Sequence, residues 1–119
     1  MQLKRTYQEM VLAADLAARN GWRALPPGRP ELTELSELLR RSGIHPREGR
    51  PATFRSPDSV RYKVASLVSA NSEYSFQGVR VTEGERRVVT EFLRDPRSMG
   101  VQALEIRIRI LRGLRADLS

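Results

Sequence analysis

Prolines and glycines interrupt this chain at intervals, and between the interruptions apolar residues recur at spacings of three and four. Such spacing places side chains on one face of an α-helix, whereas a half-buried strand alternates with a period of two. Proline cannot continue a helix and glycine commonly ends one, so the chain is limited to short amphipathic helices joined by connectors. We therefore expect a mainly α fold of about five helices, in a single helical domain that spans residues 1–119.

The first two predicted helices lie on either side of a proline-rich connector. Apolar residues between Leu3 and Ala18, Tyr7 among them, form the buried face of the first helix, which should end at Asn20-Gly21. Trp22 follows at once, and its large ring should fold back onto that helix as part of the core. The second helix should begin near residues 30 and 31, bury a stripe of leucines and end at Gly43.

The third and fourth predicted helices have clear start signals. Ser56 is followed by a proline, which is typical of an N-cap and the first helical position. Thr82 and Glu85 have the spacing of a capping box, and the helix that they open should end at Asp95-Pro96. Between these helices, residues 71–81 mix turn-forming, aromatic and β-branched residues, so one or two short strands or a wing-like loop could form there. The sequence thus allows a helix-turn-helix-like core with a short β wing.

The last segment carries two patterns at once. Residues 105–110, EIRIRI, alternate as in a strand, while apolar residues keep a helical seam from Val101 to Leu118. We interpret the segment as a helix, because the seam is long and neither glycine nor proline interrupts it before Gly113. Ile106 and Ile110 widen the apolar surface, so this helix is either deeply buried or pairs with another chain. The residues expected at such a homodimer or partner interface are Val101, Leu104, Ile108 and Leu111.

The charge of the chain favours a polyanionic partner. The formal net charge is +7 and the isoelectric point is near 10.9, which points to nucleic acid more often than to an anionic membrane. Nineteen of the 21 basic residues are arginine, and a GC-rich genome produces that bias without any contact to DNA. The alternative is therefore that much of this arginine is ordinary solvated surface.

The absence of cysteine indicates the kind of cellular compartment in which the protein folds. Without cysteine neither a disulfide framework nor a thiolate zinc site can form, which fits a reducing, cytoplasmic environment. Charged residues break up the N-terminal segment, so we expect no signal peptide, no membrane span and no membrane partner.

Residues suited to catalysis are scarce. His45 is the single histidine and has no partner at metal-ligand spacing, so we expect it to cap a loop or to pack rather than to bind a metal. The chain also lacks the patterns of a nucleophile elbow, a Walker loop and a dinucleotide-binding loop. We therefore expect no enzymatic activity, no metal and no other cofactor.

The best candidate for a binding site is the segment 53–63, TFRSPDSVRYK. A helix N-terminus offers free backbone N–H groups and a partial positive charge to an anion, and the serines here add hydroxyl groups. Arg61, Tyr62 and Lys63 lie on the side of the predicted helix away from its apolar residues, where they would face solvent or a groove. A normally capped surface helix explains the same spacing equally well. The residues predicted to contact nucleic acid are Arg47, Arg50, Arg55, Ser56, Ser59, Arg61, Lys63 and Arg80.

Four stretches of the chain also carry a family resemblance. They are NGWR at 20–23, LSELLRRSGIHP at 35–46, TFRSPDSVRYKVASL at 53–67 and VVTEFLRDP at 88–96. Together they resemble the region that precedes the nuclease module in a group of bacterial HNH endonucleases, many of them restriction enzymes. That family typically has F-R-N-x-N-G-V-x-x-K-L in the third stretch, and the match carries over Phe54, Arg55, Val60 and Lys63.

The chain departs from this pattern in ways that limit what the resemblance implies. Residues 56–59 are Ser-Pro-Asp-Ser where the family has Asn and Gly, Val89 replaces a Trp, and the His-Asn-His metal module is absent. The resemblance therefore implies only an accessory, DNA-reading unit of a restriction or defence system, without nuclease activity. Our leading hypothesis is a DNA-binding module that places its third helix in or against a groove, with DNA favoured over RNA. The alternative is a protein-interaction adaptor or homodimer built on the C-terminal helix.

Overall fold

Five α-helices make up the fold. The computed structural model describes residues 6–42, 55–71 and 81–118, with side chains described as far as Leu114. The helices are α1 (Tyr7–Arg19), α2 (Pro30–Arg41), α3 (Pro57–Ala70), α4 (Glu83–Arg94) and α5 (Pro96–Leu118). The described residues contain no strand, which confirms the mainly α prediction. Most of the predicted β wing lies outside the described residues.

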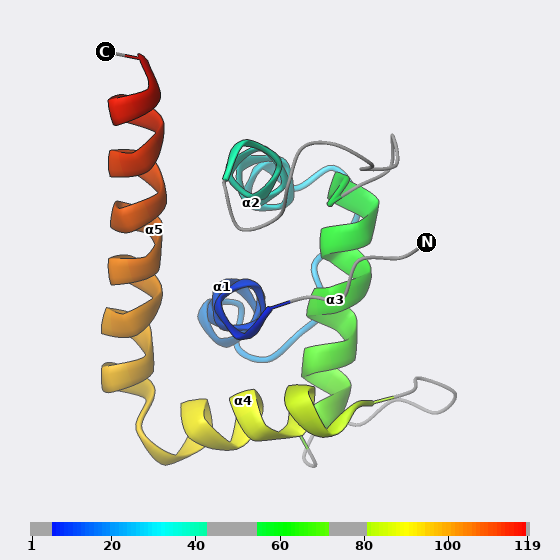
Figure 1. The fold of residues 1–119 in the computed structure, drawn as a ribbon. Coiled ribbons are helices and arrows are strands. Elements are labelled where there is room, and N and C mark those ends of the chain that lie inside the picture. Colours follow the sequence, from blue (N-terminus) through cyan, green and yellow to red (C-terminus); the bar gives the residue numbers. More distant parts are fainter. Residues whose placement is uncertain (1–5, 43–54, 72–80, 119) are drawn as a thin grey trace.

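Helix α1 is the centre of the structure. It packs against all four other helices, and Figure 1 shows it end-on between α3 and α5, with α4 crossing below. Every residue from Val11 to Ala17 is buried, so α1 is enclosed on all sides rather than along the single face expected from its sequence. Three alanines in this stretch leave room for the neighbouring helices to approach closely. Tyr7, which was expected on the buried face, is instead partly exposed.

The two ends of α1 are fixed by local hydrogen bonds. At its start, Thr6 Oγ1 accepts from the backbone N–H of Glu9 at 3.2 Å, and the Glu9 carboxylate accepts from Thr6 N–H at 3.1 Å. This capping box was readable as T-x-x-E but was not among the predictions. At its end, Gly21 and Trp22 both have positive φ, and Trp22 N–H donates to Ala17 O at 2.8 Å.

Trp22 packs against the core as predicted. Its ring meets that of Phe92 edge to face, with 6.2 Å between the ring centroids and 84° between the planes. This geometry suits the quadrupoles of the two rings, and it fixes the end of α1 against α4.

The starts of α2, α3 and α4 agree with the sequence. Ser56 is the N-cap of α3 and Thr82 that of α4, and each side chain accepts a backbone N–H three residues ahead. The predicted helix-turn-helix is not confirmed for α2 and α3, however. Residues 42–56 connect these two helices, whereas that motif uses a turn of about three or four residues.

Helix α5 begins at Pro96, earlier than the seam from Val101 suggested, and only Asp95 separates it from α4. The chain turns sharply there, and α5 then runs along one side of the molecule (Figure 1). Met99, Ala103 and Ile106 form its buried face and belong to the same core as α1 and α4. None of the described helices combines the length and the apolar content that a bilayer span requires.

Candidate nucleic-acid interface

Arg55 lies in the interior and not on a DNA-facing surface. Its guanidinium binds the carboxylate of Glu9 through two nitrogens, and the contact from Nη2 to Oε1 measures 3.1 Å. Both side chains are buried. The prediction of an Arg55 contact to phosphate is therefore corrected, because its charge is already matched inside the protein.

The backbone of Arg55 also has a structural role. Its φ of +49° lies in the left-handed region, and its carbonyl oxygen accepts a hydrogen bond of 2.7 Å from Ser36 Oγ in α2. Arg55 thus joins α1, α2 and the start of α3. A structural role of this kind accounts for the arginine in the FR motif without any contact to nucleic acid.

Lys63 is also held by a carboxylate. Its Nζ lies 3.3 Å from Oε1 of Glu85 in α4, and the side chains are 21% and 2% exposed, respectively. Glu85 is buried at the first turn of α4, so the ammonium group compensates a charge that would otherwise be unfavourable there. The expected solvent-facing position of Lys63 is corrected to this link between α3 and α4.

The two serines at the start of α3 serve the helix itself. Ser56 Oγ accepts the backbone N–H of Ser59 at 3.2 Å, and both residues are only partly exposed. This is the arrangement of an ordinary N-cap, which was the alternative reading of the segment. By itself it does not identify an anion site.

Tyr62 lies at the surface of α3, and its neighbour Arg61 is partly buried, with 33% of its side chain exposed. Tyr62 is 69% exposed, and Cζ of Arg61 lies 5.3 Å from the centroid of the Tyr62 ring. Asp58 stands one turn earlier, with 3.7 Å between its Oδ1 and Arg61 Nε, and its own side chain is 80% exposed. The sequence predicted that Tyr62 faces solvent beside Arg61, but only Arg61 was among the predicted contact residues. An aromatic residue on the polar face of a basic helix was the available signal.

The other predicted contact residues cannot be placed. Arg47, Arg50 and Arg80 lie outside the described residues, as does His45. Elsewhere, several arginines are exposed and form no ion pair with any described residue. They are Arg23, Arg41, Arg86, Arg94, Arg97, Arg109 and Arg112.

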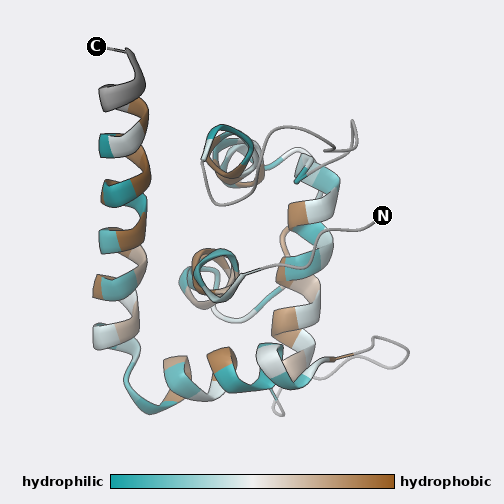
Figure 2. Ribbon diagram, in the orientation of Figure 1, coloured by the Kyte–Doolittle hydropathy of each residue, from teal (hydrophilic) through white to brown (hydrophobic). Residues whose placement is uncertain are grey.

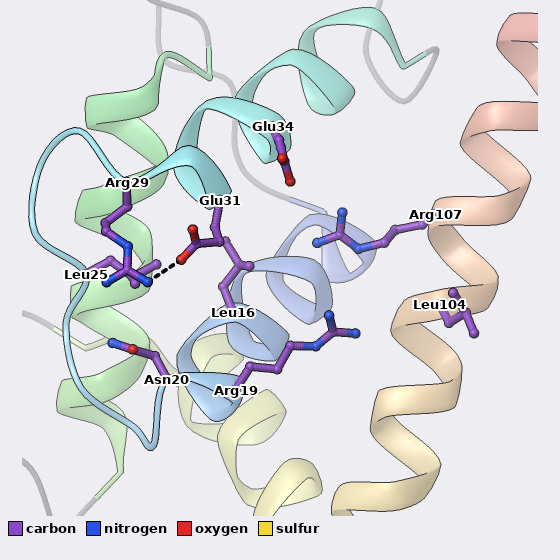
Figure 3. A pocket seen from close by; sticks show the side chains of 9 residues that line it. All are labelled: Leu16, Arg19, Asn20, Leu25, Arg29, Glu31, Glu34, Leu104 and Arg107. Carbon is purple, nitrogen blue, oxygen red and sulfur yellow. Dashed lines mark hydrogen bonds and ion pairs between the residues drawn. The ribbon is translucent and has the colours of Figure 1, made fainter.

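A cleft of about 320 Å³ lies between α1, α2 and α5. Figure 3 shows the guanidinium groups of Arg19 and Arg107 and the carboxylate of Glu34 converging on it. Burial lowers the pKa of Arg107 and raises that of Asp15, which pairs with Arg19 at 3.1 Å. Because charges of both signs line this cleft, it has no clear preference for an anion.

The described residues hold no group of three or more His, Cys, Asp or Glu side chains arranged for a metal ion.

Of the predicted interface, the α3 surface around Arg61 and Tyr62 is the described part that faces solvent. Comparison of the chain with protein-family models, with curated proteins and with solved structures finds no match.

Proposed function

We propose that this protein binds nucleic acid, and DNA in preference to RNA, through the exposed face of α3 centred on Arg61 and Tyr62. The observation that carries the proposal is the pairing of an exposed aromatic ring with a guanidinium group on one helix face. A tyrosine ring offers a flat surface on which a base can stack, and an arginine beside it can reach the phosphate or stack in turn.

The distribution of charge supports the same partner. Three carboxylates are buried among the described residues, those of Glu9, Asp15 and Glu85, and each lies beside a cationic side chain. Their charge is thus matched within the fold, and the chain as a whole carries a net charge of +7. A strongly positive protein attracts a polyanion, and this attraction speeds association.

The exposed ring also bears on which form of DNA is bound. A tyrosine can stack on a base only where that base is unpaired, at a single strand, a loop or an end. An intact duplex offers Arg61 its phosphates but offers Tyr62 no base face. We therefore expect single-stranded DNA to bind more tightly than a duplex of the same sequence.

Fluorescence anisotropy with a labelled single-stranded DNA at low salt tests the proposal. Loss of a base–aromatic stack costs about 1–3 kcal/mol, so Tyr62→Ala should weaken binding roughly 5- to 150-fold. Tyr62 is exposed, Arg61 is partly exposed and neither belongs to the hydrophobic core, so the variants should keep their fold, which circular dichroism can check. Binding of the wild type should also weaken steadily as salt is raised.

Arg87→Ala is the matched control for Arg61→Ala. Arg87 lies on α4, pairs with Glu91 and also sits above a tyrosine ring, that of Tyr7, at 5.9 Å. Both substitutions remove one positive charge, so any loss through general electrostatics is shared. Arg61→Ala should therefore weaken binding more than Arg87→Ala. Equal losses would exclude the α3 site, and no binding to single-stranded or duplex DNA at low salt would overturn the function.

A further inference from the structure

Helix α5 carries an exposed apolar row outside its buried face. We call this row the α5 seam; its members are Val101, Leu104, Ile108 and Leu111, and they are between 38% and 56% exposed. Figure 2 shows that hydrophobic residues recur along α5 as far as its last coloured turn. The seam has the spacing of three, four and three that repeats in coiled coils.

The described residues leave the seam at least partly uncovered. Met99, Ala103 and Ile106 form the inward face of α5 against the core, while the seam residues stay exposed and only Leu104 also borders the cleft between α1, α2 and α5. An apolar row of this kind on a soluble helix commonly marks an interface. We infer that the α5 seam pairs with the α5 seam of a second copy of this chain.

Self-pairing is favoured because the seam is complementary to itself. A two-fold axis places the same row of β-branched and leucine side chains on both sides of the contact. In heptad terms, Val101 and Ile108 occupy a positions and Leu104 and Leu111 occupy d positions.

The charges that flank the seam select the antiparallel orientation. Glu105 and Arg112 both fall at e positions, on the same side of the seam. In an antiparallel pair the e positions of the two helices adjoin, so each Glu105 comes near the partner's Arg112. In a parallel pair e positions adjoin g positions instead, so Glu105 would not meet the partner's Arg112.

This pairing is independent of the proposed binding face. Helices α3 and α5 lie on opposite sides of α1, so a second copy on α5 leaves Tyr62 uncovered (Figure 1). A dimer could therefore form with or without nucleic acid binding, and each can fail without the other.

Sedimentation velocity over a range of protein concentrations tests the dimer. The wild type should shift from monomer to dimer as concentration rises, and Ile108→Asp should raise the dissociation constant about tenfold or more. Leu93→Asp is the matched control, since Leu93 is 49% exposed on α4 and outside the seam. It should leave the dissociation constant unchanged. A wild type that stays monomeric, or equal effects of the two variants, would overturn the inference.

Engineered cysteines test the orientation, and the chain has none of its own to interfere. In the antiparallel pair Val101 lies opposite the partner's Leu111. Oxidation of a mixture of Val101→Cys and Leu111→Cys chains should thus give the mixed disulfide dimer, while Leu111→Cys alone should give little crosslink. Efficient crosslinking of Leu111→Cys alone would show a parallel pair and contradict the antiparallel assignment.

Discussion

The carboxylate of Glu9 in α1 and the guanidinium of Arg55 before α3 form a buried ion pair across 46 positions of sequence. Neither group is exposed enough to exchange its partner for water. Glu9 also completes the capping box with Thr6, so one carboxylate both starts α1 and secures the segment that leads into α3. The pair therefore links local helix formation to the packing of the core.

Arg55→Met should destabilise the protein by about 3–5 kcal/mol, because it leaves the Glu9 carboxylate buried without its cation. Urea denaturation followed by circular dichroism measures the loss. Arg86→Met is the control, since Arg86 is exposed on α4 and should change stability by no more than about 0.5 kcal/mol. The double variant Glu9→Met/Arg55→Met should lose less than the sum of the single variants. Additive losses would mean that the two side chains do not act as a pair.

The fate of Arg55 also shows what sequence reasoning could and could not reach. Helix ends depend on residues a few positions apart, so Ser56, Thr82 and the stop at Asp95-Pro96 could be read directly. Whether an arginine is buried depends on a carboxylate from elsewhere in the chain. No local sequence pattern reveals that Glu9 and Arg55 form an ion pair in the folded protein. For this reason the predicted cationic surface does not include Arg55.

The prediction of the buried face of α5 was limited in the same way, because it also depends on contacts between residues far apart in the sequence. The helical period of its apolar residues was correctly preferred to the strand-like alternation of EIRIRI. Two apolar faces compete on this helix, however, and periodicity cannot say which one meets the core. The structure buries Ile106 and leaves the α5 seam outside, because α1 and α4 receive the face that carries Met99 and Ala103.

Ser56→Ala should destabilise the protein by about 1 kcal/mol, because the N–H of Ser59 loses the acceptor that caps α3. Thermal unfolding compares this variant with Thr33→Ala, a hydroxyl removed from an exposed position within α2. The control should be neutral or slightly stabilising, since alanine is the better helix former. A Ser56→Ala variant as stable as the wild type would exclude a capping role for this side chain.

Phe92→Leu should weaken the packing of Trp22 at the end of α1. The edge-to-face contact of the two rings adds about 0.5–1.5 kcal/mol to the free energy of burial, and leucine cannot replace it. Trp22 is the single tryptophan, so the emission comes from this residue and reports on its surroundings, which include Phe92. We expect lower stability and a changed emission spectrum in the native state. An unchanged spectrum would contradict the contact, and Leu93→Ala, on the exposed side of α4, provides the comparison.

Asp15 should make stability depend on pH in the acid range. Burial is the largest influence on this carboxyl group and raises its pKa above the ordinary 3.8, while Arg19 and Arg107 oppose the shift. The folded protein then binds the proton more tightly than the unfolded chain does, so the group favours folding most below pH 3.8. That contribution is lost as pH rises through the pKa of the folded state.

Asp15→Asn removes this titration and so isolates it. The stability of the wild type minus that of Asp15→Asn should be greatest below pH 3.8 and should fall as pH rises, until Asp15 is ionised in the folded state. Urea denaturation of both proteins at a series of pH values gives this difference directly, because the remaining groups titrate in both. If the difference grows with pH, the attraction of Arg19 and Arg107 exceeds the cost of burying the carboxylate, and the direction of the shift is wrong.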